Sequence, residues 1–210
     1  MDSEVEAYMS KSEAAYEEAV SMLGDMSSWE VYENSQELAA YRRHSPSGLD
    51  ILKIEFFIPR SPNQVLDFIY KNLGDIHNSL NPDLVREHKL FKEYSDITRI
   101  RYELIDAGIP GVSPRDILYF GIKLQVSDDV FALIETSVEH PEKPIRPDVI
   151  RAEVNYALHF CEKLNGQCHV VALAYADSKG SIPKTFINMG LRRRVDFYKV
   201  LIKEILAHTT

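Results

Sequence analysis

The sequence predicts an α+β fold, in which a long, curved antiparallel sheet has a helix lying across it. Three observations predict this class. The expected elements run in the order helix, three strands, helix, six strands and a long last helix. Successive strands are joined by short turns, which antiparallel neighbours allow and parallel neighbours do not. Two of these turns are Asp128-Asp129 and Asn165-Gly166, and the second dipeptide is strongly typical of a two-residue hairpin.

The helices are marked by their ends and by apolar residues at helical spacing. Ser3 and Glu6 form a capping box at the start of the first helix, and Gly24 is typical of a helix end. Ser61-Pro62 starts the second helix, because serine caps helix N-termini and proline is favoured in the first turn. The last helix is expected from residue 182 to about 207, with an apolar face of Ile187, Leu191, Val195, Tyr198, Ile202 and Ile205.

The strands are marked by runs rich in β-branched and aromatic residues. Pro59 ends the third of them, because proline cannot donate a hydrogen bond to a neighbouring strand. No repeat or flexible linker divides the sequence, so residues 1–210 are expected to form one domain. The expected strands are residues 29–32, 38–43, 49–58, 85–94, 97–105, 116–126, 130–137, 150–164 and 167–176.

Composition narrows the class of function. The chain has 24 basic and 32 acidic residues and a formal net charge of −8, so no nucleic-acid partner is expected. Its two cysteines are too few for a disulfide framework and fit a reducing compartment. The N-terminal residues do not resemble a secretory signal, and the apolar runs are too short to span a bilayer. We therefore expect a soluble, cytoplasmic protein.

The usual motifs of catalysis and cofactor binding are not found in the sequence. There is no glycine-rich nucleotide loop, no G-x-S-x-G turn and no H-E-x-x-H zinc motif. The Asn165-Gly166 turn would place His159, Cys161 and Cys168 on one face of the sheet and His169 on the other. That spacing is too wide for a zinc site or for an unstrained disulfide. We expect ordinary sheet residues here, with no metal and no cofactor.

Two charged groups are open to two interpretations each. Arg101 and Glu103 are two residues apart on one expected strand and therefore share a face. They are solvated if that face is outward, and they are a candidate site if it is inward. The run Arg192-Arg193-Arg194 on the last helix is either a solvated helix face or a contact for anionic lipid headgroups.

Three segments together closely resemble the StAR-related lipid-transfer (START) domain. They are Ser113-Pro114-Arg115-Asp116, Val149-Ile150-Arg151-Ala152-Glu153 and residues 177–188, and the resemblance covers nearly the whole chain. It implies a helix-grip fold, in which a curved nine-stranded antiparallel sheet surrounds a long C-terminal helix. It also implies an apolar tunnel that holds one lipid, with that helix and the 106–112 loop as its lid. Such domains are carriers or sensors, not enzymes.

The resemblance also implies where a ligand would bind. Sterol-binding members pair an acid, here Glu103, with an arginine at a position that Gly121 occupies in this sequence. We therefore expect Arg101 or Lys123 to be the partner of Glu103, and the missing arginine weighs against a sterol. With strand faces set from these positions and from side-chain size, the expected ligand contacts are Arg101, Glu103, Ile109, Val112, Tyr119, Gly121, Lys123, Tyr156, Leu158, Phe160, Leu173, Tyr175, Phe186 and Leu191.

The leading interpretation is intracellular lipid binding and transfer. A lipid that leaves a bilayer loses about 0.8 kcal/mol of favourable burial per methylene, which an apolar interior must replace. We expect one phospholipid, ceramide-like lipid or sterol, a transient contact with a membrane surface, and a monomer. Two alternatives are a cyclase- or hydrolase-type enzyme on a helix-grip scaffold, with His169 or Glu103 as base, and an interaction module that docks through its basic run.

Overall fold

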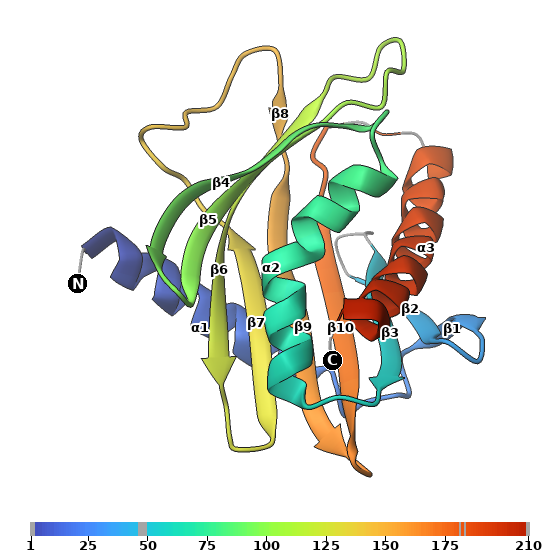
Figure 1. Cartoon of the computed structure of the whole chain (residues 1–210). Helices are drawn as coiled ribbons and strands as arrows, with labels where there is room; N and C mark the ends of the chain where they lie inside the picture. The colour runs from blue at the N-terminus through green and yellow to red at the C-terminus, as the bar shows by residue number, and fades with distance from the viewer. Residues whose placement is uncertain (1–2, 46–49, 181, 183, 209–210) are drawn as a thin grey trace.

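The structure is a computed structural model that describes residues 3–45, 50–180, 182 and 184–208, without the side chains of residues 184–189. Within these residues the helices are α1 (Ser3–Ser21), α2 (Pro62–Leu80) and α3 (Lys184–His208) (Figure 1). None of the described helices is long and apolar enough to cross a membrane. The strands are β1 (Glu30–Asn34), β2 (Ala39–His44), β3 (Asp50–Ile58), β4 (Val85–Ser95), β5 (Thr98–Ile105), β6 (Arg115–Gln125), β7 (Val130–Ser137), β8 (Ile150–Arg151), β9 (Glu153–Leu164) and β10 (Gln167–Asp177).

The strands form one sheet in the order β1-β2-β3-β10-β9-β7-β6-β5-β4, and all neighbours along this path are antiparallel. The predicted fold class is thus confirmed. The expected strand 150–164 is divided at Ala152, and its first part, β8, pairs in parallel with β6. Asn165 and Gly166 have φ values of 52° and 79°, as a tight two-residue hairpin requires.

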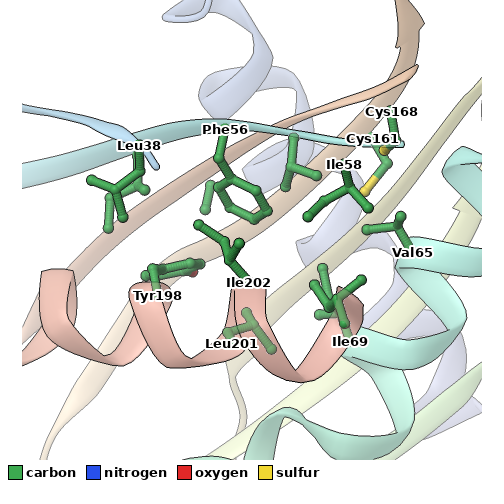
Figure 2. Close-up of a cluster of buried hydrophobic side chains, with 14 of the residues drawn as sticks. Leu38, Phe56, Ile58, Val65, Ile69, Cys161, Cys168, Tyr198, Leu201 and Ile202 are labelled. Carbon is green, nitrogen blue, oxygen red and sulfur yellow. The ribbon is translucent and has the colours of Figure 1, made fainter. Parts of the chain in front are cut away.

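Helices cover both faces of the curved sheet. In Figure 1, α2 and α3 lie in front of the strands and α1 lies behind them. We call the face under α2 and α3 the inner face and the face under α1 the outer face. On the inner face, Phe56 and Ile58 of β3 pack against Val65 of α2 and Ile202 of α3 (Figure 2). Burial of these side chains fixes α2 and the C-terminal half of α3 on the sheet.

The predicted strand faces are right for β5 and β6 but wrong for β9 and β10. Gly121 pairs with Glu135, Glu135 with Ala157, and Ala157 with Ala174, so these four residues share the inner face. Both faces of the sheet are buried, and here the larger side chains pack under α1, so side-chain size does not identify the inner face. The residues that therefore lie on the outer face, contrary to prediction, are Tyr156, Leu158, Phe160, Leu173 and Tyr175.

Buried charged contacts fix the turn that leads into α3. Arg115, at the start of β6, donates hydrogen bonds of 3.3 Å to the carbonyl oxygens of Ser178 and Lys179. The next residue, Asp116, accepts bonds of 2.7 and 3.0 Å from the guanidinium of Arg151 on β8. Lys179 and Gly180 have φ values of 52° and 64°, so the chain turns sharply at this point. The three sequence segments that carry the family resemblance therefore meet at the start of α3.

Candidate functional site

The candidate site is a group of polar side chains on the inner face of the sheet, beneath α2 and α3. Protein interiors bury charged groups at a high cost, so a buried group of this kind marks a candidate site. We call it the inner polar cluster. Its members are Tyr70 and His77 of α2, His88 of β4, Arg99, Arg101 and Glu103 of β5, Tyr119 of β6, Glu135 of β7, Asn155 and His159 of β9, and Tyr198 of α3.

Gly74 allows α2 to lie close to β4 and β5 above this cluster. A Cβ atom at Gly74 would lie 1.8 Å from Cε1 of His88 and 2.8 Å from a terminal nitrogen of Arg101. A side chain at this position would displace His88 and Arg101 from their present places, so glycine permits the close approach. His88 in turn lies 3.3 Å from the Tyr119 hydroxyl, through its Nε2 atom.

Glu103 is 7% exposed and forms an ion pair with His77. The prediction that Arg101 or Lys123 would be its partner is therefore wrong. The Oε1 atom of Glu103 lies 2.9 Å from Nδ1 of His77. Burial raises the pKa of Glu103, but His77 and the nearby charges of His88 and Arg194 outweigh that effect and lower it overall. Lys123 pairs instead with Asp67 of α2, at 2.6 Å.

His159 is held in its neutral form in the middle of the cluster. Its Nε2 atom lies 2.8 Å from the hydroxyl of Tyr198, which connects β9 to α3. Burial, with a smaller effect from the charge of Arg194, lowers the pKa of His159 to about 3. Cys161 and Cys168 share the inner face with His159, as predicted, and are free thiols. No three possible metal ligands converge within the described part of the chain.

Five buried polar atoms of the inner polar cluster have no hydrogen-bond or ion-pair partner among the described residues. A buried polar atom without a partner costs about 1–3 kcal/mol, so such atoms are rare in proteins. The five atoms are Tyr70 Oη, Arg99 Nε, Arg101 Nε, Asn155 Oδ1 and His159 Nδ1. A bound molecule with polar groups would satisfy them.

Part of the inner face beside the cluster remains partly exposed although helices cover the sheet. Ala157 and Ala174 lie on the central strands β9 and β10 yet remain partly exposed, as does Tyr119 on β6. Central strands that are covered by helices are normally fully buried. Small and incompletely covered side chains next to unpartnered polar atoms are what a ligand site requires.

The predicted lid residues lie at one end of the molecule. The 106–112 loop is found at the same end as the N-terminus of α3 (Figure 1). Ile109 and Val112 are half-buried in it, and the φ values of Gly108 and Gly111 are 63° and 82°. Leu191 of α3 is half-buried and packs against the inner core. The side chain of Phe186 lies outside the described residues.

A surface hollow of about 280 Å³ lies between the end of α2 and α3. Phe197 lines it and makes an edge-to-face contact with His77, with ring centroids 5.6 Å apart. Because His77 also contacts Glu103, Phe197 connects the lining of the hollow to the inner polar cluster. The other lining residues are Leu80, Asn81, Pro82, Asp83, Leu84, Arg193, Asp196 and Val200.

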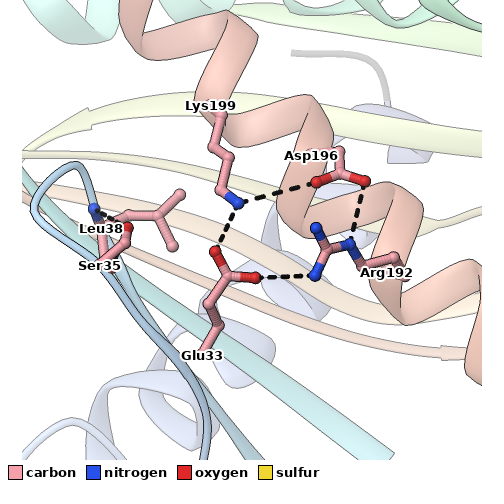
Figure 3. A network of polar contacts seen from close by, with 6 residues as sticks. All are labelled: Glu33, Ser35, Leu38, Arg192, Asp196 and Lys199. Atoms are coloured by element: carbon pink, nitrogen blue, oxygen red, sulfur yellow. Dashed lines mark hydrogen bonds and ion pairs between the residues drawn. The ribbon is translucent and has the colours of Figure 1, made fainter.

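One carboxylate on the edge strand β1 holds two basic residues of α3. Glu33 lies 3.2 Å from Arg192 and 2.5 Å from Lys199, and Asp196 lies between the two basic residues (Figure 3). We call this group the Glu33 clasp. The basic run is therefore divided, because Arg192 is paired within the protein whereas Arg193 and Arg194 are exposed. The clasp lies beside the inner polar cluster, because its residues Asp196 and Lys199 flank Tyr198 on α3.

The buried histidine should make stability depend on pH. Between about pH 6.5 and 3 the unfolded chain binds a proton at His159 that the folded chain does not, so stability falls as the pH is lowered. From pH 7 to pH 5 the wild type is expected to lose about 2 kcal/mol more unfolding free energy than His159→Gln. Urea unfolding at both pH values measures this difference. Equal losses in the two proteins would show that His159 is protonated in the folded state.

Several residues of the cluster were not predicted from the sequence. Glu135 is the only charged residue in strand β7, which is otherwise apolar apart from its C-terminal Thr136 and Ser137. That isolated charge is the signal that could have identified it. Tyr70, His77 and His88 carry no comparable signal, because they reach the cluster only through the packing of α2 and β4 against β5.

Residues 10–202 match the family described as START domain. Human StAR-related lipid transfer protein 5 is similar in structure, with a TM-score of 0.77 and 18% identity over 96% of this chain and 97% of that chain. Human STARD10 is similar with a TM-score of 0.71 and 19% identity, over 92% of this chain and 79% of that chain. A STAR-related lipid transfer protein fragment from Xanthomonas axonopodis is similar with a TM-score of 0.67 and 20% identity, over 85% of this chain and 98% of that chain. No curated protein matches the sequence significantly.

Proposed function

Since the chain belongs to the START domain family, we propose that it binds one lipid between the inner face and helices α2 and α3 and transfers it between membranes. The five unpartnered polar atoms of the inner polar cluster are the observation that carries this proposal. The polar end of a lipid would supply their missing hydrogen bonds. Its apolar part would lie along the incompletely covered inner face near Ala157 and Ala174.

The chain would act as a monomer that touches a membrane surface transiently, in the cytoplasm, where its two free thiols stay reduced. A phospholipid, a ceramide-like lipid or a sterol would fit the general proposal. START domains generally bind lipids and do not catalyse reactions. Transfer of a fluorescent lipid between donor and acceptor vesicles tests the proposal, and a rate no higher than without protein would reject it.

We further propose that α3 and the 106–112 loop form the gate of the site. The turn at Lys179 and Gly180 would serve as the hinge of α3, because both residues adopt left-handed backbone conformations next to the anchored Arg115. The two glycines of the loop, Gly108 and Gly111, would let it move with the helix. The Glu33 clasp would hold α3 in its closed position.

Glu33→Gln is accordingly expected to speed lipid transfer between neutral vesicles about two- to fivefold. Partly exposed ion pairs contribute about 0.2–1 kcal/mol each, and the clasp contains two of them to Glu33. High salt should speed transfer by the wild type for the same reason, and the variant should respond less. The measurement is the transfer rate at low and high ionic strength.

Glu30→Gln is the matched control. Glu30 lies on the same strand and makes an ion pair with Arg42 of β2, at 2.9 Å, without touching α3. It should leave the transfer rate unchanged. Equal rates for Glu33→Gln and the wild type, at both salt concentrations, would contradict the role of the clasp.

A further inference from the structure

Arg99, Gly121 and Glu135 form a row across three neighbouring strands of the inner face. Arg99 of β5 pairs with Gly121 of β6, and Gly121 pairs with Glu135 of β7. The two charged residues are therefore about 10 Å apart at their Cα atoms. A Cβ atom at Gly121 would lie 3.3 Å from Cγ of Glu135 and 3.4 Å from its Oε1. The side chain of Glu135 thus leans over the glycine, in the direction of β5.

These opposite charges are buried but not paired. Glu135 is 6% exposed and Arg99 is 7% exposed. Buried opposite charges normally form ion pairs, because each charge is otherwise costly. Within the described part of the chain, Glu135 makes no hydrogen bond and no ion pair. Burial raises the pKa of Glu135, and the charges of Arg99, Arg101 and Arg194 offset that effect only in part.

Other contacts hold Arg99 away from Glu135, and one guanidinium nitrogen of Arg99 and one of Arg101 have no partner in the part of the chain that the structure describes. The guanidinium of Arg99 stacks on the ring of Tyr70, 3.5 Å from its centroid, and donates a hydrogen bond to the Tyr70 carbonyl oxygen. The Nε atoms of Arg99 and Arg101 have no hydrogen-bond partner among the described residues. The site therefore presents a carboxylate on one side and two guanidinium groups on the other.

We propose that Glu135 makes this site selective for lipids with a zwitterionic phosphate–ammonium headgroup, with the ammonium at Glu135 and the phosphate at Arg99 and Arg101. This inference rests on the proposed function. A phosphate accepts charge-assisted hydrogen bonds from guanidinium groups, and an ammonium pairs with a carboxylate. A phospholipid with an anionic headgroup leaves Glu135 unpaired and repelled, whereas a sterol or a ceramide leaves the arginines unpaired. Gly121 contributes by leaving space for the carboxylate.

The test is a competition among lipids, in which the phospholipids have matched acyl chains. The purified protein is incubated with vesicles that contain equal amounts of phosphatidylcholine, phosphatidylethanolamine, phosphatidic acid, ceramide and cholesterol, and its bound lipid is identified by native mass spectrometry. The wild type should carry phosphatidylcholine, phosphatidylethanolamine or both in at least about tenfold excess over phosphatidic acid. Glu135→Gln, which keeps the shape of the side chain, should lower that ratio at least about tenfold.

Glu139→Gln is the matched control, since Glu139 is an exposed carboxylate just beyond β7 and the change in net charge is the same. It should keep the wild-type ratio. A wild type that prefers phosphatidic acid, ceramide or cholesterol overturns this inference and leaves the proposed function standing, whatever the variant does. An unchanged ratio in Glu135→Gln also overturns it. Recovery of no lipid from any of the proteins would instead reject the proposed function, and this inference with it.

Discussion

Arg151→Ala is expected to lower the free energy of unfolding by about 3–5 kcal/mol. The guanidinium of Arg151 donates two hydrogen bonds to Asp116, whose side chain is 1% exposed. Removing the arginine leaves the buried carboxylate of Asp116 without a partner. The free-energy cost of burying that carboxylate is then no longer offset. Urea unfolding followed by circular dichroism measures the loss.

The same chemistry at the surface provides the control. Arg146 donates two hydrogen bonds of 3.2 and 2.6 Å to Asp148, but these side chains are 44% and 64% exposed. Arg146→Ala should cost less than about 1 kcal/mol, because water replaces the lost contact. Similar losses in the two variants would show that burial does not explain the contribution of the Arg151–Asp116 pair to the free energy of unfolding.

Ala157→Phe should reduce lipid transfer at least about tenfold while the protein stays folded. Ala157 lies on the inner face beside Glu135 and Ala174, where the side chains leave space. A phenyl ring there would occupy the volume that the proposed ligand needs. The overpacking should cost about 1–3 kcal/mol of stability, less than a domain of this size has in reserve. The vesicle transfer assay measures the effect.

Val171→Phe places the same ring on the opposite face of the sheet, on the neighbouring strand β10. Val171 pairs with Phe160 of β9 and therefore lies on the outer face, towards the α1 side. This variant should transfer lipid at the wild-type rate. Transfer by Ala157→Phe at that rate, or equal impairment of both variants, would mean that the ligand does not lie on the inner face.

Local sequence signals predicted most of the fold. Ser61-Pro62 predicted the start of α2, where the structure shows a capping box of Ser61 and Gln64, and the Asn165-Gly166 turn sets the register of β9 and β10. The family resemblance depended on segments such as Ser113-Pro114-Arg115-Asp116, and the family match confirms it. Those residues are informative because their roles are local: Arg115 and Asp116 anchor the turn and the short strand next to them.

The candidate site was less predictable, for a physical reason. Alternation shows that Tyr156 and Ala157 point in opposite directions, but it does not show which direction is inward when helices bury both faces. The partner of Glu103 also depends on tertiary packing. His77 reaches it because Gly74, one turn earlier in α2, lets that helix approach β5 closely. The sequence of α2 alone, or of β5 alone, predicts neither the close approach of the two elements nor the His77–Glu103 ion pair.

The central claim is that one lipid occupies the inner face beneath α2 and α3. Native mass spectrometry of the protein, after incubation with vesicles of a total cellular lipid extract, tests this claim most directly. The account predicts a species with one lipid bound per chain in the wild type, and its loss in Ala157→Phe but not in Val171→Phe. A wild-type protein that carries no lipid after this incubation, while it remains folded by circular dichroism, would contradict the account.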